Sequence, residues 1–334
     1  MMKLRKKLLT LLLVCIMVIP GSLVANAATT ALVTDYSSLV TALSNKVDLI
    51  VILNDITLED TLNIDYNVSF TSYNNESPIL NNTYGKTHIT VTGTDISISF
   101  ENIVLYGENW QGGIYSTADS LLIQNAYIIK CTFAVRTEGN LIIDGGTYSQ
   151  GSVGILCNGD LTIEDGNIED NRVTGYGCGI SCSGTVTING GRIANNFAGG
   201  NTPCNGAGIY INGGTLNING GEISNNTVYG NGGGIFIAGG TLNMYGGEIS
   251  GNSALYYFTD NGGGIYATSS TINIYGGTIT GNLAGAGGGI YAVSCILNIA
   301  GGDINSNTPD DIYSNTYYTN NNSSETFMKM RGVL

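Results

Sequence analysis

The chain has 334 residues, of which 43% are hydrophobic and only 11% are charged, and its formal net charge at pH 7 is −13. An acidic chain is repelled by nucleic acid and by anionic membrane surfaces, so the charge argues against both as partners. Neutral glycans, cations and basic proteins remain compatible with it.

The first 27 residues have the pattern of a secretory signal peptide. Four basic residues precede an apolar run at 8–20, and Ala25-Asn26-Ala27 supplies an A-x-A cleavage site. The run is too short for a transmembrane anchor, so we expect cleavage after Ala27 and no membrane insertion. The leader holds four of the twelve basic residues and no acidic one, which leaves 17 excess negative charges on the mature chain. These features predict a secreted or cell-surface protein.

Residues 28–48 form the predicted N-terminal cap. The segment from Asp35 to Ser44 places Leu39 and Leu43 on one face of a short amphipathic helix. The open end of a β-structured core has to be covered, and a helix laid across it does this. Irregular early strands are expected after this cap.

A short phrase recurs along the second half of the chain. It consists of a Gly-rich run with Ile and an aromatic residue, then Thr-hydrophobic-x-hydrophobic-x-Gly-Gly-x-Ile-x-x-Asn, and one copy runs from Gly262 to Asn282. Successive copies lie 20 to 30 residues apart when aligned on the second Gly of the Gly-Gly pair, at Gly146, Gly166, Gly191, Gly221, Gly247, Gly277 and Gly302. Apolar residues two apart predict three short strands per copy, each with one buried face.

Three short strands separated by Gly and Asn turns cannot bury a core alone. Coils that stack on one another form three parallel sheets around a continuous apolar interior. We therefore predict an all-β fold, a parallel β-helix of about ten to eleven coils over residues 49–313, about 50 Å long. Residues 314–334, rich in Asn, Ser and Tyr, are expected to form a C-terminal cap or a disordered tail.

One asparagine recurs after the second strand of each coil, at Asn171, Asn196, Asn226, Asn252, Asn282 and Asn307. Stacked asparagine amides can hydrogen-bond from coil to coil, and asparagine tolerates left-handed turn geometry. The alternative is a row of ligand-binding amides. We favour the structural role, because a buried turn requires such hydrogen bonds.

Six cysteines remain beyond the leader: Cys131, Cys157, Cys178, Cys182, Cys204 and Cys295. Cys157 and Cys182 hold equivalent inward positions on neighbouring coils, about 4.8 Å apart. Parallel side chains aim their sulfur atoms poorly for a disulfide, so we favour free thiols there, with a disulfide as the alternative. Cys178 and Cys204, in the loops before the third strand, are the more favourable pair for a bridge.

Aromatic residues recur at one outward position on four consecutive coils, directly after the third-strand isoleucine. They are Tyr210, Phe236, Tyr266 and Tyr291, with Ser181 at the same place in the preceding coil. Rings about 4.8 Å apart can stack on sugar rings or receive an extended partner chain. The same rings can instead stabilise neighbouring strands, by about 0.2–1 kcal/mol per pair.

The densest group of carboxylates lies at residues 164–170, next to Arg172. A polysaccharide hydrolase or lyase that uses Glu164, Asp165 and Arg172 is therefore the alternative function. Asp144 and Glu164 are expected to stack in one outward column. The repeats contain no histidine, and the Gly-rich phrase matches neither a phosphate loop nor the calcium-binding nonapeptide. We expect no cofactor and no metal.

The Gly-Gly-Gly-Ile phrases, together with Ile-x-x-Asn at 223–226, 249–252 and 279–282, resemble the repeats of polymorphic outer-membrane proteins. Those repeats pair Gly-Gly-Ala-hydrophobic with Phe-x-x-Asn, so this chain has Ile in place of Phe. The resemblance covers roughly residues 175–313 and implies a surface-exposed, non-catalytic, adhesin-like role. The wider chain resembles the pectate-lyase-like superfamily, which implies a right-handed β-helix.

These observations favour an exported, non-catalytic adhesin-like protein. Its expected partner is an extracellular glycan or a protein surface on a host or neighbouring cell. The residues expected to bind that partner are Tyr210, Phe236, Tyr266 and Tyr291.

Overall fold

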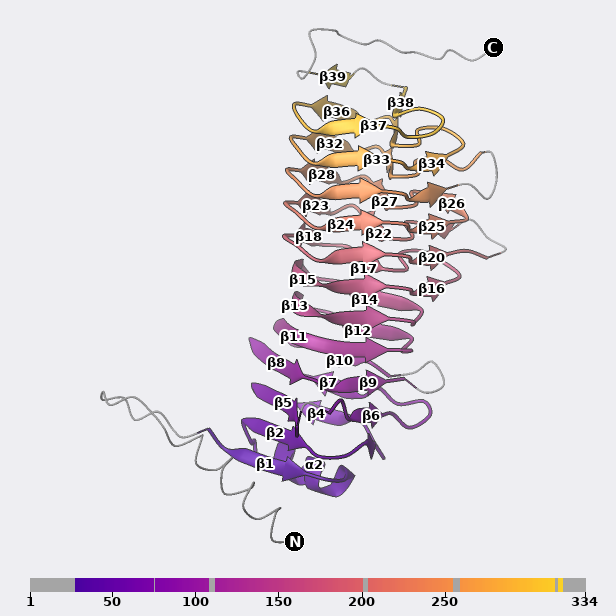
Figure 1. Cartoon of the computed structure of the whole chain (residues 1–334). Helices are drawn as coiled ribbons and strands as arrows, with labels where there is room; N and C mark the ends of the chain where they lie inside the picture. The colour runs from indigo at the N-terminus through magenta and orange to yellow at the C-terminus, as the bar shows by residue number, and fades with distance from the viewer. Residues whose placement is uncertain are drawn as a thin grey trace, which may run out of the picture.

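The computed structural model describes residues 28–74, 76–107, 112–200, 204–254 and 259–315, and the backbone of residues 318–320. Nearly all of it is β-structure, arranged as a solenoid-like stack of parallel strands (Figure 1). The predicted all-β stacked architecture is confirmed. The predicted signal peptide at 1–27 and the tail from residue 321 lie outside the described residues.

The strands form two large sheets and two small ones, here called sheets A to D. Sheet A contains β1 (Thr30–Val33), β2 (Leu49–Ile52), β3 (Ile56–Thr57), β5 (Val68–Ser72), β6 (Ile79–Asn81), β8 (Ile96–Glu101), β9 (Val104–Tyr106), β11 (Ser120–Ile129), β13 (Asn140–Ser149), β15 (Leu161–Glu169), β18 (Thr185–Ile188), β19 (Arg192–Ala194), β23 (Thr215–Ile218), β24 (Glu222–Ser224), β28 (Thr241–Met244), β29 (Glu248–Ser250), β32 (Thr271–Ile274), β33 (Thr278–Thr280), β36 (Ile296–Ile299), β37 (Asp303–Asn305) and β39 (Tyr318–Asn320).

Sheet B contains β4 (Leu62–Ile64), β7 (Ile89–Val91), β10 (Ile114–Ser116), β12 (Phe133–Thr137), β14 (Val153–Cys157), β17 (Ile180–Cys182), β22 (Ile209–Asn212), β27 (Ile235–Ala238), β31 (Ile265–Thr268), β35 (Ile290–Val293) and β38 (Ile312–Ser314). Sheet C contains β16 (Arg172–Val173), β20 (Phe197–Ala198), β25 (Thr227–Val228), β30 (Ser253–Ala254) and β34 (Leu283–Ala284). Sheet D contains β21 (Cys204–Asn205) and β26 (Gly230–Asn231).

Each later coil contributes three strands, as the repeat predicts. The expected distribution over three separate sheets is wrong, because the two strands on either side of the Gly-Gly turn both belong to sheet A and the third belongs to sheet B. In three middle coils the two sheet A strands are fused into one long strand, as β11, β13 and β15, whereas the first coils keep them separate, as in β5 with β6 and β8 with β9. The repeat places a Gly-Gly turn at Gly145-Gly146, but β13 continues through both residues. Their positive φ angles of 86° and 93° bend the chain as a bulge does, so the strand changes direction without ending.

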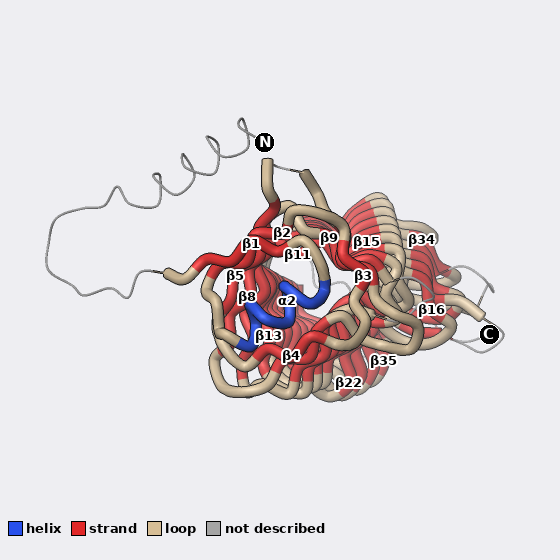
Figure 2. Tube along the Cα trace, turned by 90° about the horizontal axis from the view of Figure 1, so that it is seen from below, coloured by secondary structure: helices blue, strands red, loops and turns tan. Residues whose placement is uncertain are grey.

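The predicted capping helix is present as α2 (Tyr36–Ser44). The Asp35 carboxylate accepts a hydrogen bond from the Ser38 backbone N–H at 2.8 Å, and Ser38 Oγ accepts one from the Asp35 N–H at 3.2 Å. This reciprocal capping box begins the helix. Leu39 and Leu43 are buried in the same core as the strands, and α2 lies across the lower end of the stack (Figure 2). Within the described part of the chain, no helix is long and apolar enough to span a membrane.

One hydrophobic core runs through the whole stack, from α2 to the last coils. It is built from columns of inward aliphatic side chains in register, such as Ile209, Ile235, Ile265 and Ile290, all fully buried. Burying each such side chain contributes about 1.5–3 kcal/mol. Because each column continues through every coil, the coils stabilise one another.

The recurring asparagines form a continuous hydrogen-bonded ladder inside the stack. Asn226 Oδ1 accepts both the backbone N–H and the Nδ2 of Asn196 at 3.0 Å, and Asn226 Nδ2 donates to Ile193 O at 2.9 Å. The pattern repeats up to Asn307, whose backbone N–H and Nδ2 both donate to the Asp311 carboxylate. All six asparagines are buried. The predicted structural role is confirmed, and Asp311 ends the ladder.

The left-handed turn lies one residue before each ladder asparagine rather than at the asparagine itself. Asn195 and Asn225, for example, both have a φ of 54°. The third glycine of each Gly-rich phrase packs against the ladder: a Cβ on Gly234 would lie 2.7 Å from Gly264 O and 3.0 Å from Asn252 Nδ2. The ladder therefore requires glycine at this position, because any side chain would displace the neighbouring coil.

The six described cysteines are all buried free thiols. Cys157 and Cys182 are register partners in sheet B, so the free-thiol interpretation of that pair is confirmed. The expected Cys178–Cys204 bridge is wrong. Both residues instead pack as small apolar side chains in a second core beside sheets C and D, together with Ala198, Ala207, Val228, Ala254 and Ala284. Burial raises the pKa of Cys178 to about 12, which keeps it protonated and unreactive.

We predict that Asn226→Ala strongly destabilises the protein, because it leaves the buried donors of Asn196 without their acceptor. Each such group costs about 1–3 kcal/mol, so the free energy of unfolding should fall by about 3 kcal/mol or more. The matched control is Asn219→Ala, which removes an exposed hydrogen bond to Asn189 and should change stability by about 0.5 kcal/mol at most. Equal urea midpoints for the two variants would contradict the ladder's role.

Candidate functional site

The aromatic residues predicted to bind a partner lie in one straight column on the outer face of sheet B. β22, β27, β31 and β35 pair in register and place Tyr210, Phe236, Tyr266 and Tyr291 at successive neighbouring positions. Ring centroids are 5.2 Å apart, and ring planes differ by only 3–9°. In Figure 2 the sheet B strands β4, β22 and β35 follow one side of the stack.

Two further tyrosines extend this column at its ends. Tyr313 on β38 is the register partner of Tyr291, with ring centroids 4.7 Å apart. Ile312-Tyr313 repeats the Ile-Tyr pair of the earlier coils, so the sequence pattern could have predicted that Tyr313 belongs to this column. Tyr176 lies in a loop and stacks on Tyr210 at 5.1 Å, and no repeat position marks it. The six rings from Tyr176 to Tyr313 are called the aromatic column below.

Stacking determines which part of each ring remains accessible. Every interior ring has a neighbour on both faces, so a ligand meets ring edges and hydroxyl groups rather than ring faces. Phe236, at 8% exposed, is nearly buried, while the column tyrosines on β22, β31, β35 and β38 are half-buried. The column therefore presents a row of edges and hydroxyls to a partner.

The hydroxyl groups of Tyr210, Tyr266 and Tyr291 are protonated at neutral pH. Burial raises the pKa of Tyr210, Tyr266 and Tyr291 above the ordinary tyrosine value of 10. A protonated phenol both donates and accepts a hydrogen bond. Phe236 interrupts the row, so the column carries two hydroxyl groups before it, at Tyr176 and Tyr210, and three after it, from Tyr266 to Tyr313.

The sheet B strands along the aromatic column are uncharged. The seven strands β14, β17, β22, β27, β31, β35 and β38 contain no charged residue. The next outward column of sheet B runs through Asn212, Ala238, Thr268 and Val293 in register. In a chain with a net charge of −13, this is a neutral surface on an acidic molecule.

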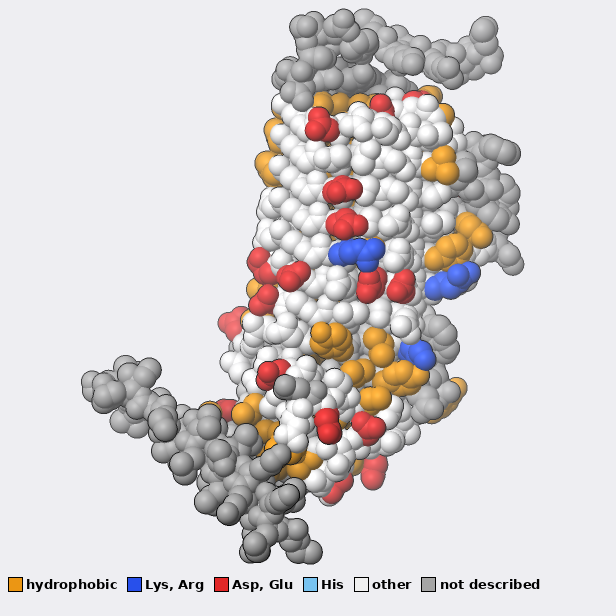
Figure 3. All heavy atoms as spheres, viewed as in Figure 1, with side chains coloured by type: hydrophobic (Ala, Val, Ile, Leu, Met, Phe, Trp, Pro, Cys, Tyr) orange, Lys and Arg blue, Asp and Glu red, His pale blue; other side chains and the backbone are white. Residues whose placement is uncertain are grey.

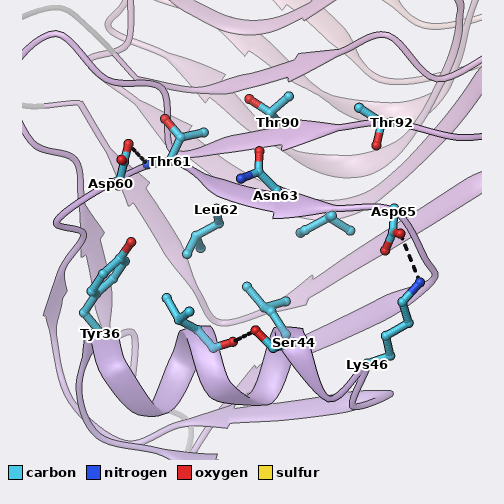
Figure 4. A pocket seen from close by; sticks show the side chains of 13 residues that line it. Tyr36, Ser44, Lys46, Asp60, Thr61, Leu62, Asn63, Asp65, Thr90 and Thr92 are labelled. Atoms are coloured by element: carbon cyan, nitrogen blue, oxygen red, sulfur yellow. Dashed lines mark hydrogen bonds and ion pairs between the residues drawn. The ribbon is translucent and has the colours of Figure 1, made fainter.

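A groove of about 730 Å³ lies at the N-terminal end, between α2 and the strands β4 and β7 (Figure 4). Val40 and Leu43 line its helical wall, while Asn63 and Thr90 line the opposite wall. Lys46 at its rim is paired with Asp65 at 3.0 Å. Asn63 and Thr90 are register partners on sheet B, so the groove lies at the N-terminal end of the sheet that carries the aromatic column.

The residues of the alternative catalytic site are directed to separate partners. Glu164 Oε2 accepts a hydrogen bond from Asn189 Nδ2 at 2.9 Å. The Arg172 guanidinium lies 4.1 Å from the ring centroid of Phe197, on sheet C. It makes a cation–π contact there instead of facing the Glu164 carboxylate.

The expected column of Asp144 over Glu164 is wrong. A register shift between β13 and β15 places Asp144 opposite Asp165 instead. The extra residue at this shift is Glu164 on β15, and the register returns to its earlier offset at Thr147 and Asn167, beyond Gly145-Gly146. A residue inserted in one strand moves the side chains after it by one position until the partner strand adds one as well.

Arg192 pairs with Glu169 at 2.6 Å and with Glu222 at 3.6 Å. These partly exposed ion pairs contribute about 0–1 kcal/mol each and neutralise part of the acidic surface. On the face shown in Figure 3, acidic side chains are spread along the stack rather than gathered in one hollow. Within the described residues, no group of three His, Cys, Asp or Glu side chains is arranged to hold a metal ion.

His88 is a buried structural residue. Its Nδ1 accepts a hydrogen bond from the Gly113 N–H at 2.8 Å, and Nε2 lies 2.9 Å from Leu80 O and 3.1 Å from Tyr106 O. Nε2 therefore carries the proton and donates to these carbonyls. Burial lowers the pKa of His88 to about 4, so the ring is neutral at physiological pH.

Comparison with protein-family models, with curated proteins and with solved structures found no match for this chain. The resemblances noted above rest on the motifs alone. The features available for a functional inference are the aromatic column, the uncharged strands along it, and the groove between α2 and the strands β4 and β7.

We predict that His88 makes the protein less stable as the pH falls from 6.5 to 4. In this window the unfolded chain binds a proton at His88 and the folded chain does not, which costs about 3 kcal/mol by pH 4. Urea unfolding of His88→Asn, whose amide can still accept from the Gly113 N–H, should show a weaker loss between pH 6.5 and 4.5 than the wild type. The same loss in both proteins would contradict this assignment.

Proposed function

We propose that the chain is an exported, non-catalytic protein that binds a glycan outside the cell through the aromatic column. In this proposal the stack is a right-handed parallel β-helix of about ten to eleven coils. Residues 1–27 are removed as a signal peptide, and the mature protein is secreted or held at the cell surface. This function agrees with the adhesin-like role that the repeat resemblance implies.

The observation that carries the proposal is the aromatic column on an uncharged face. Six rings follow one another at 4.7–5.2 Å, and the seven sheet B strands from β14 to β38 contain no charged residue. Ordered aromatic groups with few charges are typical of surfaces that bind an uncharged ligand. A row of phenol hydroxyls suits a ligand that is itself rich in hydroxyl groups.

A protein strand is a less suitable partner for this surface. Side chains on one face of an extended peptide are about 6.6–6.8 Å apart, which does not match the ring spacing. Addition of a strand requires an exposed sheet edge, whereas β22, β27, β31 and β35 are paired on both sides. A glycan lying along the stack axis meets neither difficulty.

Polysaccharide cleavage has less support than binding. Glycoside hydrolysis needs two carboxylates on opposite sides of the scissile glycosidic bond. Here Glu164 accepts a hydrogen bond from Asn189, while Arg172 packs on Phe197. The hydrolase hypothesis would be established by release of reducing or unsaturated ends from a polysaccharide, with loss of that activity in Glu164→Gln.

The test keeps the ring stack and removes its hydroxyls. The triple variant Tyr210→Phe/Tyr266→Phe/Tyr291→Phe should retain its thermal midpoint but lose affinity for glycans bound by the wild type on an array. Three lost hydrogen bonds of about 0.5–1.5 kcal/mol each predict a loss of about ten-fold or more.

The matched control is the double variant Tyr245→Phe/Tyr275→Phe. These tyrosines also stack, at 5.1 Å, and are 54% and 48% exposed, but they lie outside the aromatic column. The control should bind as the wild type does. Equal affinity of the triple variant and the wild type, or binding only to proteins, would refute a glycan site at the aromatic column.

A further inference from the structure

Tyr176 differs from the other members of the aromatic column in its origin. It lies in the loop between β16 and β17 and forms a bridge with Asn205, whereas the other five rings project from strands of sheet B. Its ring nevertheless stacks on Tyr210, with centroids 5.1 Å apart and planes 29° apart. The column is thus extended by a residue that the repeat does not supply.

The strand beneath Tyr176 leaves room for this ring. Ser181 is the register partner of Tyr210, so it occupies the place where the next ring of the column would stand. The loop turns at Gly177, with a φ of 62°, and a Cβ there would lie 2.7 Å from Ser181 Cβ. The small Ser181 and the left-handed Gly177 together allow the loop to bring Tyr176 into the column.

Tyr176 has one accessible ring face. Phe236 covers one face of Tyr210, so Tyr176 lies against the other face, on the side of β17. Tyr176 is 53% exposed, and among the described rings only Tyr210 stacks on it. Interior rings offer edges alone, whereas Tyr176 offers a flat apolar face directed along the stack.

The surface next to this ring face is apolar and then neutral. Leu156, the register partner of Ser181, is half-buried on the adjacent strand β14. One strand further, the Arg136 guanidinium lies over the Tyr115 ring at 5.4 Å and pairs with Glu138 at 3.3 Å. The arginine charge is therefore engaged by its neighbours.

We propose that Tyr176 is the terminal stacking platform of the glycan site, where its free face receives the apolar face of one sugar ring of a neutral chain. This inference rests on the proposed function and adds a residue and a ligand class to it. The sugar packs between the Tyr176 ring and the Leu156 side chain, and the rest of the glycan follows the hydroxyl row from Tyr210 onward. A carboxylated chain is disfavoured, because the described residues around the site offer no unpaired cation and the molecule is strongly acidic.

Calorimetric titration of the purified mature chain tests the inference. The probes are cello-oligosaccharides and N-acetylated chito-oligosaccharides as neutral chains, and oligogalacturonates as the anionic chain. Tyr176→Ala should weaken binding of the neutral chain about two- to twelve-fold. Tyr176→Phe keeps the ring face and should bind as the wild type does. Tyr245→Ala, which removes an equally exposed tyrosine elsewhere, should have no effect.

The outcomes separate this inference from the proposed function. If neutral chains bind and Tyr176→Ala binds equally well, the platform is refuted and the column remains. Loss of binding in Tyr176→Phe as well would show that the ligand binds the Tyr176 hydroxyl group rather than the ring face. That result would also contradict stacking. Stronger binding of oligogalacturonates would overturn the neutral ligand class. Binding of none of the probes would overturn both the proposed function and this inference.

Discussion

The buried asparagine ladder is the interaction on which the rest of the structure depends. Each amide accepts two hydrogen bonds from the asparagine of the preceding coil and donates to the following one, so the coils cannot slide past one another without leaving buried polar groups unpaired. A slip of one residue would also turn the inward aliphatic columns outward. The ladder also requires the third glycine of each Gly-rich phrase, since a Cβ at that position would clash with the ladder amide and with the next coil. The Asp311 carboxylate ends the chain of donors.

The same register produces the candidate site. Once the coils are fixed one strand apart, a residue repeated at one outward position becomes a column, and tyrosine or phenylalanine there becomes a stack of nearly parallel rings. Stacking stabilises the strands, and it covers the ring faces with neighbouring rings. Stabilisation and recognition, the two roles expected from the sequence, therefore involve different parts of each ring. Faces hold the stack together, and edges with hydroxyls remain for a partner. At Tyr176, which is 53% exposed and stacks on one described ring, a face stays accessible.

The repeat alone was sufficient to predict the stacked strands, the buried asparagines and the aromatic column from Tyr210 to Tyr291, because each follows from spacing. Where the structure differs, the cause is local geometry that spacing does not encode. The Gly145-Gly146 pair bends a strand instead of ending it, and the extra residue Glu164 on the partner strand places Asp144 opposite Asp165. Cys178 and Cys204 pack in a second small core instead of forming a bridge. Tyr176 joins the column from a loop, through a contact between segments that no periodic pattern describes.

The most direct test of the glycan surface is ring-resolved NMR of the mature chain with ¹³C-labelled tyrosine, titrated with a neutral oligosaccharide that the wild type binds. The shifts should be concentrated at Tyr176, Tyr210, Tyr266, Tyr291 and Tyr313, with the exposed pair Tyr245 and Tyr275 unchanged. Shifts confined to Tyr36, which lines the groove beneath α2, or to Tyr245 and Tyr275, would place the ligand elsewhere and contradict the central claim.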